Sequence, residues 1–344
     1  MRPPPWRLRP CAQAALLSTV LLLAACDDSP TSPTTSLSLS CPASFEVQSR
    51  DGRPVVVTYP PPLPLGGTAP VSVTCTPASG SVFPVRTTAV TCTATDARQA
   101  TASCGFTVTV TPPPYLRYTR FLAFGDSLTE GQDGIAAPTG TGGYVPLVVR
   151  PEIAYPTRLQ EKLIARYVAQ TPQVINRGVG GERATTGVNR LPTEITSVRP
   201  EVVLLLEGAN DIAGGNAAGL TPAANALRTM VRDTRSRGLP VLLATLPPED
   251  PTRPRGGGAA LVVPLNDLIR RIALEEGAVL VDLFAAFNGD LTLLGPDGLH
   301  PNEAGYLRMA DTFFLVIRER LETSFPGGAA VPAASLPSSA GGVP

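Results

Sequence analysis

The fold class follows from residues 202–211, which read Val202-Val203-Leu204-Leu205-Leu206-Glu207-Gly208-Ala209-Asn210-Asp211. The first half of this segment is an unbroken aliphatic run, which is typical of a strand buried on both faces of a parallel sheet. The second half is polar, and in parallel α/β sheets the carboxyl ends of the strands carry the binding and catalytic groups. The segment therefore predicts a central strand that delivers polar side chains to a functional edge.

The same pattern extends in both directions along the chain. Further buried-strand patterns lie at residues 121–124, 174–175, 240–246 and 278–281. Helical patterns alternate with these strands. Two of them lie at 155–169 and at 221–238, the second with Pro222 at the first helical position. Two more are apolar stripes at helical spacing, one formed by Leu261, Leu265, Leu268 and Ile272 and the other by Leu307, Ala310, Phe314, Ile317 and Leu321. Strands that alternate with helices predict an α/β domain with a mostly parallel sheet, which we place at residues 118–324.

Residues 41–111 follow a different pattern. Short alternating or β-branched segments, separated by turn residues, occupy 55–59, 71–75, 89–93 and 106–110. They predict a small all-β sandwich without a catalytic constellation. Residues 112–117 begin with three prolines and are expected to form a stiff linker, and residues 325–344 are expected to be a disordered tail.

The N-terminus has the features of an export signal. Arg2, Arg7 and Arg9 precede an apolar run, Ala12–Ala25, which is too short to span a bilayer comfortably. Leu23-Ala24-Ala25-Cys26 resembles the lipobox of bacterial lipoproteins. The resemblance implies that residues 1–25 are removed, that Cys26 is lipidated, and that the protein is exported from a bacterial cytoplasm and anchored to a membrane. An ordinary secretory signal with a chance cysteine is the alternative.

The tether and the cysteines fit an exported chain. Residues 26–40 are rich in Ser, Thr and Pro and are expected to be flexible. Of the 6 cysteines, Cys11 leaves with the signal and Cys26 carries the lipid, which leaves Cys41, Cys75, Cys92 and Cys104. An even, clustered set in an exported chain predicts two disulfides, whose pairing the spacing leaves open. A metal site is the alternative, but the cluster contains neither a Cys-x-x-Cys motif nor a nearby histidine.

Composition excludes several classes of function. The 28 basic and 28 acidic residues balance, so the net charge gives no support for a nucleic-acid partner, which usually needs a basic face. His300 is the only histidine, which excludes zinc sites that need two or more, and we expect no metal. Lys162 is the only lysine and lies in an ordinary helical pattern, which argues against a phosphate-binding loop and against pyridoxal chemistry. No cofactor is expected.

Polar segments follow the predicted strands at four places. They are Gly125-Asp126-Ser127-Leu128, Asn176 to Glu182, Glu207 to Asp211, and Asp297-Gly298-Leu299-His300-Pro301. A serine hydroxyl becomes a good nucleophile when a base takes its proton, and the base is usually a histidine oriented by a carboxylate. Backbone and side-chain amides then bind the developing oxyanion. The segments contain all the residue types that acyl transfer needs.

Together, these segments resemble the SGNH (GDSL) esterase/lipase family over residues 118–324. The resemblance implies a flavodoxin-like, three-layer α/β/α fold. It also implies that Ser127 is the nucleophile, His300 the general base and Asp297 its carboxylate partner. The oxyanion hole would consist of the backbone amides of Ser127 and Gly181 and the side chain of Asn210. This chain departs from the family at Gly180-Gly181, where Ser-Gly is common, which puts the local loop geometry in doubt.

The family resemblance also bounds the substrate. Family members hydrolyse lipid, aryl and acetylated-sugar esters without a metal, so a small-molecule, lipid or glycan ester is expected. The acyl chain, the alcohol and the choice between hydrolysis and transfer stay open. Gly134–Val149, which carries Tyr144, is a candidate for shaping the acyl pocket.

The all-β region has a family resemblance of its own. Its segments Cys75–Pro84, Val90–Asp96 and Cys104–Val108 resemble the HYR module, whose members have adhesion or spacer roles.

Each candidate residue also has a purely structural interpretation. Ser127 is a suitable helix cap, Asn210 and Asp211 are suitable turn residues, and Asp297 is a suitable cap for the last helix. The glycines at 178, 180 and 181 resemble a broken dinucleotide fingerprint.

Two alternative functions stay open. One is a carbohydrate O-acetyl esterase or acyltransferase that uses the same residues, and the other is a surface-binding protein whose α/β domain is no longer catalytic.

Overall fold

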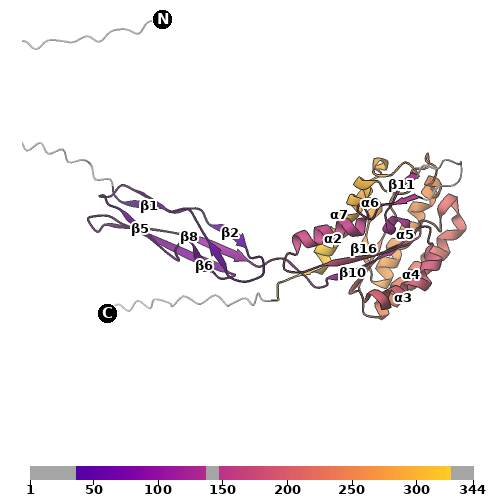
Figure 1. The fold of residues 1–344 in the computed structure, drawn as a ribbon, viewed down its shortest axis with the longest axis horizontal. Coiled ribbons are helices and arrows are strands. Elements are labelled where there is room, and N and C mark those ends of the chain that lie inside the picture. Colours follow the sequence, from indigo (N-terminus) through magenta and orange to yellow (C-terminus); the bar gives the residue numbers. More distant parts are fainter. Residues whose placement is uncertain (1–35, 137–146, 327–344) are drawn as a thin grey trace, which may run out of the picture.

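The computed structural model describes residues 36–136 and 147–326. Figure 1 shows an all-β region, formed by the earlier residues, followed by an α/β region. The signal segment 1–25, Cys26, the start of the tether and the tail from residue 327 lie outside the described residues. The lipid anchor and the membrane location therefore stay predictions.

A five-stranded sheet forms the centre of the α/β region, and all its strands are parallel. In sheet order they are β13 (Gln173–Gly178), β10 (Arg120–Gly125), β14 (Val202–Leu206), β15 (Val241–Ala244) and β16 (Val279–Val281). In chain order this is 2-1-3-4-5, the flavodoxin-like order. Every residue of β14 is buried, as the aliphatic run predicted. The expected fold class is confirmed.

Helices cover both faces of this sheet (Figure 1). Their bounds are α2 (Tyr155–Arg166), α3 (Ala184–Val198), α4 (Leu220–Ser236), α5 (Ala259–Glu276), α6 (Leu283–Phe287) and α7 (Glu303–Leu321). Helix α2 packs against α7 in one layer, while α4 contacts both α3 and α5 in the other. The region therefore has three layers, with one continuous hydrophobic core on both sides of the sheet.

Helix α3 is the main element that the sequence pattern did not predict. It contains Pro192, a residue that disfavours helix interiors. The start of the helix is capped by a residue from outside it. The carboxylate of Asp211 accepts a hydrogen bond from the backbone amide of Ala184 at 2.7 Å and another from the hydroxyl of Thr185 at 3.1 Å. This cap comes from a distant segment, so a local pattern does not reveal it.

Several short elements complete the α/β region. They are α1 (Ser127–Glu130), β9 (Tyr115–Leu116), β11 (Gln132–Ala136), β12 (Leu147–Val149), β17 (Glu322–Thr323) and the 3₁₀ turns η1 (Ala213–Gly215), η2 (Ala217–Gly219), η3 (Gly256–Gly258) and η4 (Leu291–Leu293). Strand β9 pairs with β17, so residues 115–116, which the sequence placed in the linker, join the α/β region instead. Helix α2 ends before the expected residue 169, and the hydroxyl of Tyr167 donates to Glu322 at 2.8 Å.

The all-β region contains eight strands in three sheets. They are β1 (Ser38–Ser40), β2 (Phe45–Gln48), β3 (Val55–Val57), β4 (Leu63–Leu65), β5 (Ser72–Thr76), β6 (Ser81–Phe83), β7 (Thr87–Thr95) and β8 (Thr101–Thr111). The sheet β2-β8-β7-β5 packs against the β3-β6 pair around a core that includes Val57, Phe83 and Val108. This is the expected sandwich. It begins earlier than expected, because the last residues of the tether form β1 and pair with β4.

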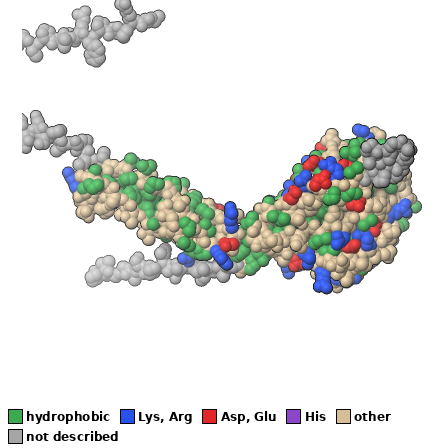
Figure 2. Space-filling view, in the orientation of Figure 1, with side chains coloured by type: hydrophobic (Ala, Val, Ile, Leu, Met, Phe, Trp, Pro, Cys, Tyr) green, Lys and Arg blue, Asp and Glu red, His purple; other side chains and the backbone are tan. Residues whose placement is uncertain are grey.

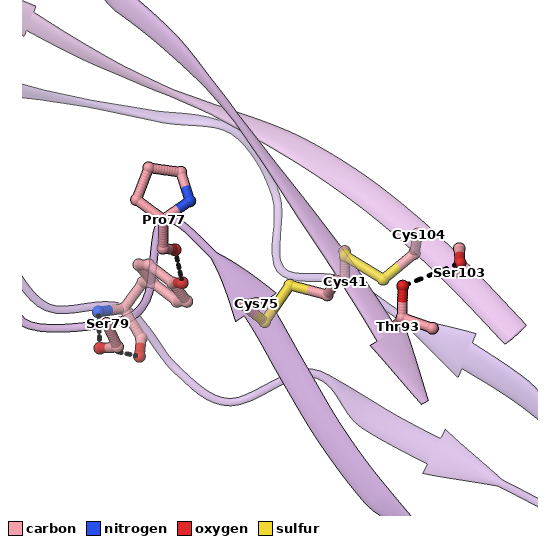
Figure 3. The surroundings of a disulfide bond; sticks show 9 residues. Cys41, Cys75, Pro77, Ser79, Thr93, Ser103 and Cys104 are labelled. Atoms are coloured by element: carbon pink, nitrogen blue, oxygen red, sulfur yellow. Dashed lines mark hydrogen bonds between the residues drawn. A yellow bond between two sulfur atoms is a disulfide. The ribbon is translucent and has the colours of Figure 1, made fainter. Parts of the chain in front are cut away.

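Two disulfides stabilise the sandwich, as the cysteine cluster predicted (Figure 3). Cys41 bonds to Cys104, and Cys75 on β5 bonds to Cys92 on β7. Cys92 and Cys104 are register partners on β7 and β8, yet each is bonded to a different cysteine. Cys92 is also the register partner of Cys75 on β5, to which it is bonded. The pairing thus depends on how the side chains meet in the folded sandwich, which the spacing along the chain does not contain.

The surface of the α/β region mixes charges of both signs. On the face that Figure 2 shows, basic and acidic side chains lie beside one another. Ion pairs between helices contribute to this pattern, such as Arg158 with Glu303 and Lys162 with Asp311. Within residues 36–136 and 147–326, none of the helices has the length and apolarity needed to cross a bilayer.

Candidate functional site

Ser127 lies at a sharp turn between strand β10 and helix α1. Asp126 caps the helix, because its Oδ1 accepts a hydrogen bond from the amide of Leu128 at 2.9 Å. Ser127 is therefore not the cap, and its hydroxyl is available for another partner. Gly125 makes the turn possible, since a Cβ there would lie 2.2 Å from the carbonyl oxygen of Leu206.

The structure brings His300 against Ser127, although the two residues are 173 positions apart. His300 Nε2 lies 2.8 Å from Ser127 Oγ, and His300 Nδ1 lies 2.6 Å from Asp297 Oδ2. The imidazole is completely buried, and the serine and aspartate are 4% and 7% exposed. The three side chains form one continuous hydrogen-bonded chain with little access to water.

Asp297 holds the imidazole in one tautomer. Its Oδ1 accepts hydrogen bonds from the backbone amides of Leu299 and His300, both at 3.0 Å. Burial raises the pKa of Asp297, but the hydrogen bonds and the contact with His300 outweigh burial and lower that pKa overall. An ionised carboxylate accepts only, so Nδ1 of His300 carries the proton and Nε2 is free to accept from the serine hydroxyl.

Asn210 and Gly181 lie in the turns that follow β14 and β13. The chain turns after β13, where the amide of Glu182 donates to the carbonyl of Val179 at 3.1 Å and Gly181 has φ +77°. Asn210 Nδ2 donates to the carbonyl oxygen of Glu182 at 2.7 Å and lies 3.5 Å from Asp126 Oδ2. The side chain of Asn210 thus links the turn that contains Gly181 to Asp126, the residue before Ser127.

The local packing explains the departure at Gly180. A Cβ at this position would lie 2.2 Å from Gln132 Nε2 and 2.7 Å from Glu130 Oε2, two groups that are hydrogen-bonded to each other at 2.9 Å. A serine would displace this pair. The glycine therefore suits the neighbours that this chain places around the turn.

Carboxyl groups that the sequence analysis did not assign lie directly behind the site. Burial raises the pKa of Asp126 to about 7, and the negative charges of Asp211 and Glu182 add to the rise. Burial also raises the pKa of Glu207 well above its ordinary value, with further contributions from Asp126 and Glu182. One signal was present in the sequence: Glu207 follows directly on the aliphatic run of β14.

The segment proposed to shape an acyl pocket is only partly described. Its ends form β11 and β12, while Tyr144 lies outside the described residues. A Cβ at Gly134 would lie 2.5 Å from Asp297 Oδ1, so the hairpin packs directly against the carboxylate. Ile135 and Val148 on this hairpin are 48% and 36% exposed, which places aliphatic surface near the site.

Comparisons with known protein families agree with both regions. Residues 123–308, more than half of the chain, match the GDSL-like Lipase/Acylhydrolase family. Residues 35–110 match the HYR domain. The expected family resemblances of the two regions are therefore confirmed.

Curated relatives are esterases. An acetylxylan esterase from Geobacillus stearothermophilus is 26% identical over 212 residues, which cover 56% of this chain and 91% of that enzyme. A multidomain esterase from Ruminococcus flavefaciens is 25% identical over 133 residues, which cover 38% of this chain but 17% of the length of that protein.

Among solved structures, the native aryl esterase of M. smegmatis has the same fold. The two structures superpose with a TM-score of 0.50 at 20% sequence identity, over 59% of this chain and 100% of that one. The comparison supports the three-layer architecture of the α/β region.

Proposed function

Because this chain belongs to the GDSL-like lipase/acylhydrolase family and is a hydrolase that acts on esters, we propose that it works through an acyl-enzyme intermediate on Ser127. The hydrogen-bonded chain from Ser127 through His300 to Asp297 carries this proposal. It supplies a nucleophile, a base in the correct tautomer and a carboxylate that stabilises the charged imidazolium.

The reaction proceeds in two steps. In the first, Nε2 of His300 accepts the proton of Ser127 as Oγ attacks the ester carbonyl and forms a tetrahedral intermediate. The imidazolium then gives this proton to the leaving alcohol as the C–O bond breaks. In the second step, a water molecule loses a proton to His300 and attacks the acyl-enzyme. The bond between the acyl carbon and Ser127 Oγ then breaks, and His300 returns the proton to Oγ as the acid leaves.

Three donors bind the oxyanion in this proposal. They are the amides of Ser127 and Gly181 and the side chain of Asn210. Asn210 is already held by the carbonyl of Glu182, and Gly181 adopts a left-handed conformation within the same turn. Donors that are fixed before the reaction need no reorganisation when charge develops, which is why such sites lower the barrier.

A serine-directed fluorophosphonate tests the proposed nucleophile. The protein is expected to hydrolyse p-nitrophenyl acetate and to lose this activity when one equivalent of fluorophosphonate binds covalently. Mass spectrometry should place the adduct on Ser127, and Ser127→Ala should carry none. Activity that persists after complete labelling would exclude Ser127, and a protein that is neither active nor labelled would favour the surface-binding alternative.

Asn210→Ala is expected to lower kcat by roughly 10²–10³-fold with a much smaller change in KM, because the donor acts mainly in the transition state. Steady-state kinetics with p-nitrophenyl acetate measure the effect. Asn216→Ala is a matched control, since its side-chain amide donates to the backbone oxygen of Asp211 at 2.9 Å instead. A kcat for Asn210→Ala equal to that of the control would contradict the assigned role.

Acetylated carbohydrate is a second candidate substrate. The similarity to an acetylxylan esterase along 91% of that enzyme favours it. The exposed aliphatic residues Ile135 and Val148 near the site favour longer acyl chains instead. A panel of p-nitrophenyl esters of increasing acyl length, together with acetylated xylan oligomers, separates the two by comparing kcat/KM. Preference for xylan acetate over every aryl ester would establish the carbohydrate substrate.

A further inference from the structure

Glu207, the residue that follows strand β14, is buried in an unusual way. Its side chain has no exposure to solvent, and neither of its carboxyl oxygens accepts a hydrogen bond from any residue in the described ranges. An ionised carboxylate without donors is strongly disfavoured in such a position. The geometry thus favours a neutral, protonated Glu207 that acts as a donor.

A second carboxyl group, Glu182, lies beside Glu207 and can accept its proton. The two side chains converge on Gly187 of α3, where a Cβ would lie 3.2 Å from Glu182 Oε2 and 3.3 Å from Glu207 Oε1. Arg190 donates from Nε to both oxygens of Glu182, at 2.9 and 3.0 Å. This guanidinium compensates a negative charge on Glu182 and leaves Glu207 as the member of the pair that keeps a proton.

Glu182 connects this pair to the reaction site. Its carbonyl oxygen accepts the hydrogen bond of the Asn210 side chain, and its amide closes the turn that contains Gly181. Arg190 also donates to the carbonyl oxygens of Arg177 and Gly125 at the ends of β13 and β10. A displacement of Glu182 would therefore move both proposed oxyanion donors relative to Ser127.

We propose that protonated Glu207 is a positioning residue, which donates a hydrogen bond to Glu182 and thereby holds the Gly181–Glu182 turn and Asn210 in the geometry that binds the oxyanion. This inference rests on the proposed roles of Asn210 and Gly181. Glu207 touches neither substrate nor nucleophile, and it acts only through Glu182.

The surroundings make the position sensitive to the loss of this proton. Asp126 faces Glu207 from the β10–α1 turn, Glu182 from the β13–α3 turn, and Arg190 from α3. The groups that approach the adjacent Gly208 are the apolar side chains of Leu227 on α4 and Leu265 on α5. If Glu207 were ionised, it would add a negative charge beside Asp126 and Glu182. Arg190 is the one positive charge among the neighbours named here.

Glu207→Gln and Glu207→Leu test the inference in the full-length protein. Glutamine keeps the shape and a donor, so its kcat for p-nitrophenyl acetate is expected to stay within about threefold of wild type. Leucine removes the donor, so kcat is expected to fall by roughly tenfold or more while KM changes less than about twofold. Glu201→Gln is the control: this carboxylate accepts amide hydrogen bonds from residues 119 and 120 at the opposite end of the sheet and should leave kcat unchanged.

Thermal unfolding between pH 5 and 9 gives a readout that does not depend on catalysis. The pKa of Glu207 is raised in the folded protein, so its contribution to stability is complete below the unfolded carboxyl pKa, about 4.3, and is lost as pH rises through the folded value. Glutamine does not titrate. The Tm of Glu207→Gln minus that of wild type is therefore expected to increase with pH.

The outcomes separate the alternatives. Equal losses of kcat in the Gln and Leu variants, or a wild-type kcat in Glu207→Leu, would overturn the positioning role. A Tm difference that stays constant with pH would overturn the buried proton. If Glu207→Leu does not fold, the kcat and the Tm profile of Glu207→Gln decide. If Ser127→Ala remains active, the proposed mechanism fails, but the Tm profile still tests the carboxyl pair.

Discussion

Purified His300→Ala is expected to lose esterase activity almost completely, with kcat reduced by roughly 10⁵–10⁶-fold. His300 Nε2 lies 2.8 Å from Ser127 Oγ, so this imidazole is positioned to take the proton of the attacking hydroxyl. Without it the serine stays protonated at neutral pH and is a poor nucleophile. Activity against p-nitrophenyl acetate, measured at matched protein concentration, gives the result.

Two features of the chain sharpen this experiment. His300 is the only histidine, so no second imidazole of the chain can substitute for it. An affinity tag without histidine avoids adding other imidazoles to the sample. Because the side chain is fully buried, thermal unfolding must show that His300→Ala is folded at the assay temperature. Near-normal hydrolysis by the folded variant would refute the assigned base.

Asp297→Asn is expected to lower kcat by about 10⁴-fold through a change of tautomer. The two backbone amides that donate to Oδ1 fix the orientation of the asparagine, because its oxygen must replace that acceptor. The amide NH₂ then faces Nδ1 of His300 and requires a lone pair there. The ring proton moves to Nε2, which can no longer accept from Ser127.

A single-histidine chain allows the tautomer to be observed directly. The ¹⁵N spectrum of the one imidazole should show a protonated Nδ1 in the wild type and a protonated Nε2 in Asp297→Asn. Glu249→Gln serves as a spectroscopic control, since Glu249 is buried and accepts from the amide of Gly258 at 2.8 Å rather than from the imidazole. An unchanged tautomer with lost activity would assign the effect of Asp297 to charge alone.

The residues proposed to carry the chemistry are recognisable from the amino-acid sequence. Ser127, Asn210 and Asp297 lie in short segments that follow strand patterns or loops, and His300 has no competitor in the chain. Such signals are local: a buried parallel strand must be continuously apolar, and the polar residue that ends it marks the functional edge. The same reasoning placed all five strands of the central sheet.

Features that depend on contacts between distant segments were missed or left open. Helix α3 contains a proline and receives its cap from Asp211, a residue beyond the next strand. Cys92 lies opposite both Cys75 and Cys104 in the sheet and is bonded to Cys75, a choice that the spacing along the chain does not contain. The reason for a glycine at position 180 is the close packing of side chains from α1 and β11, which leaves no room for a Cβ.

Amino-acid order alone was thus enough to specify the layered α/β architecture, the preceding β-sandwich and the identity of the candidate reactive side chains, because hydrophobic periodicity and strand ends are short-range properties. Only the folded chain shows that the carboxyl groups of Glu207 and Glu182 converge on Gly187, since they follow two strands that are not neighbours in the sheet. The cost of burying a charge depends on what surrounds it in three dimensions, and that environment has no counterpart in the linear pattern.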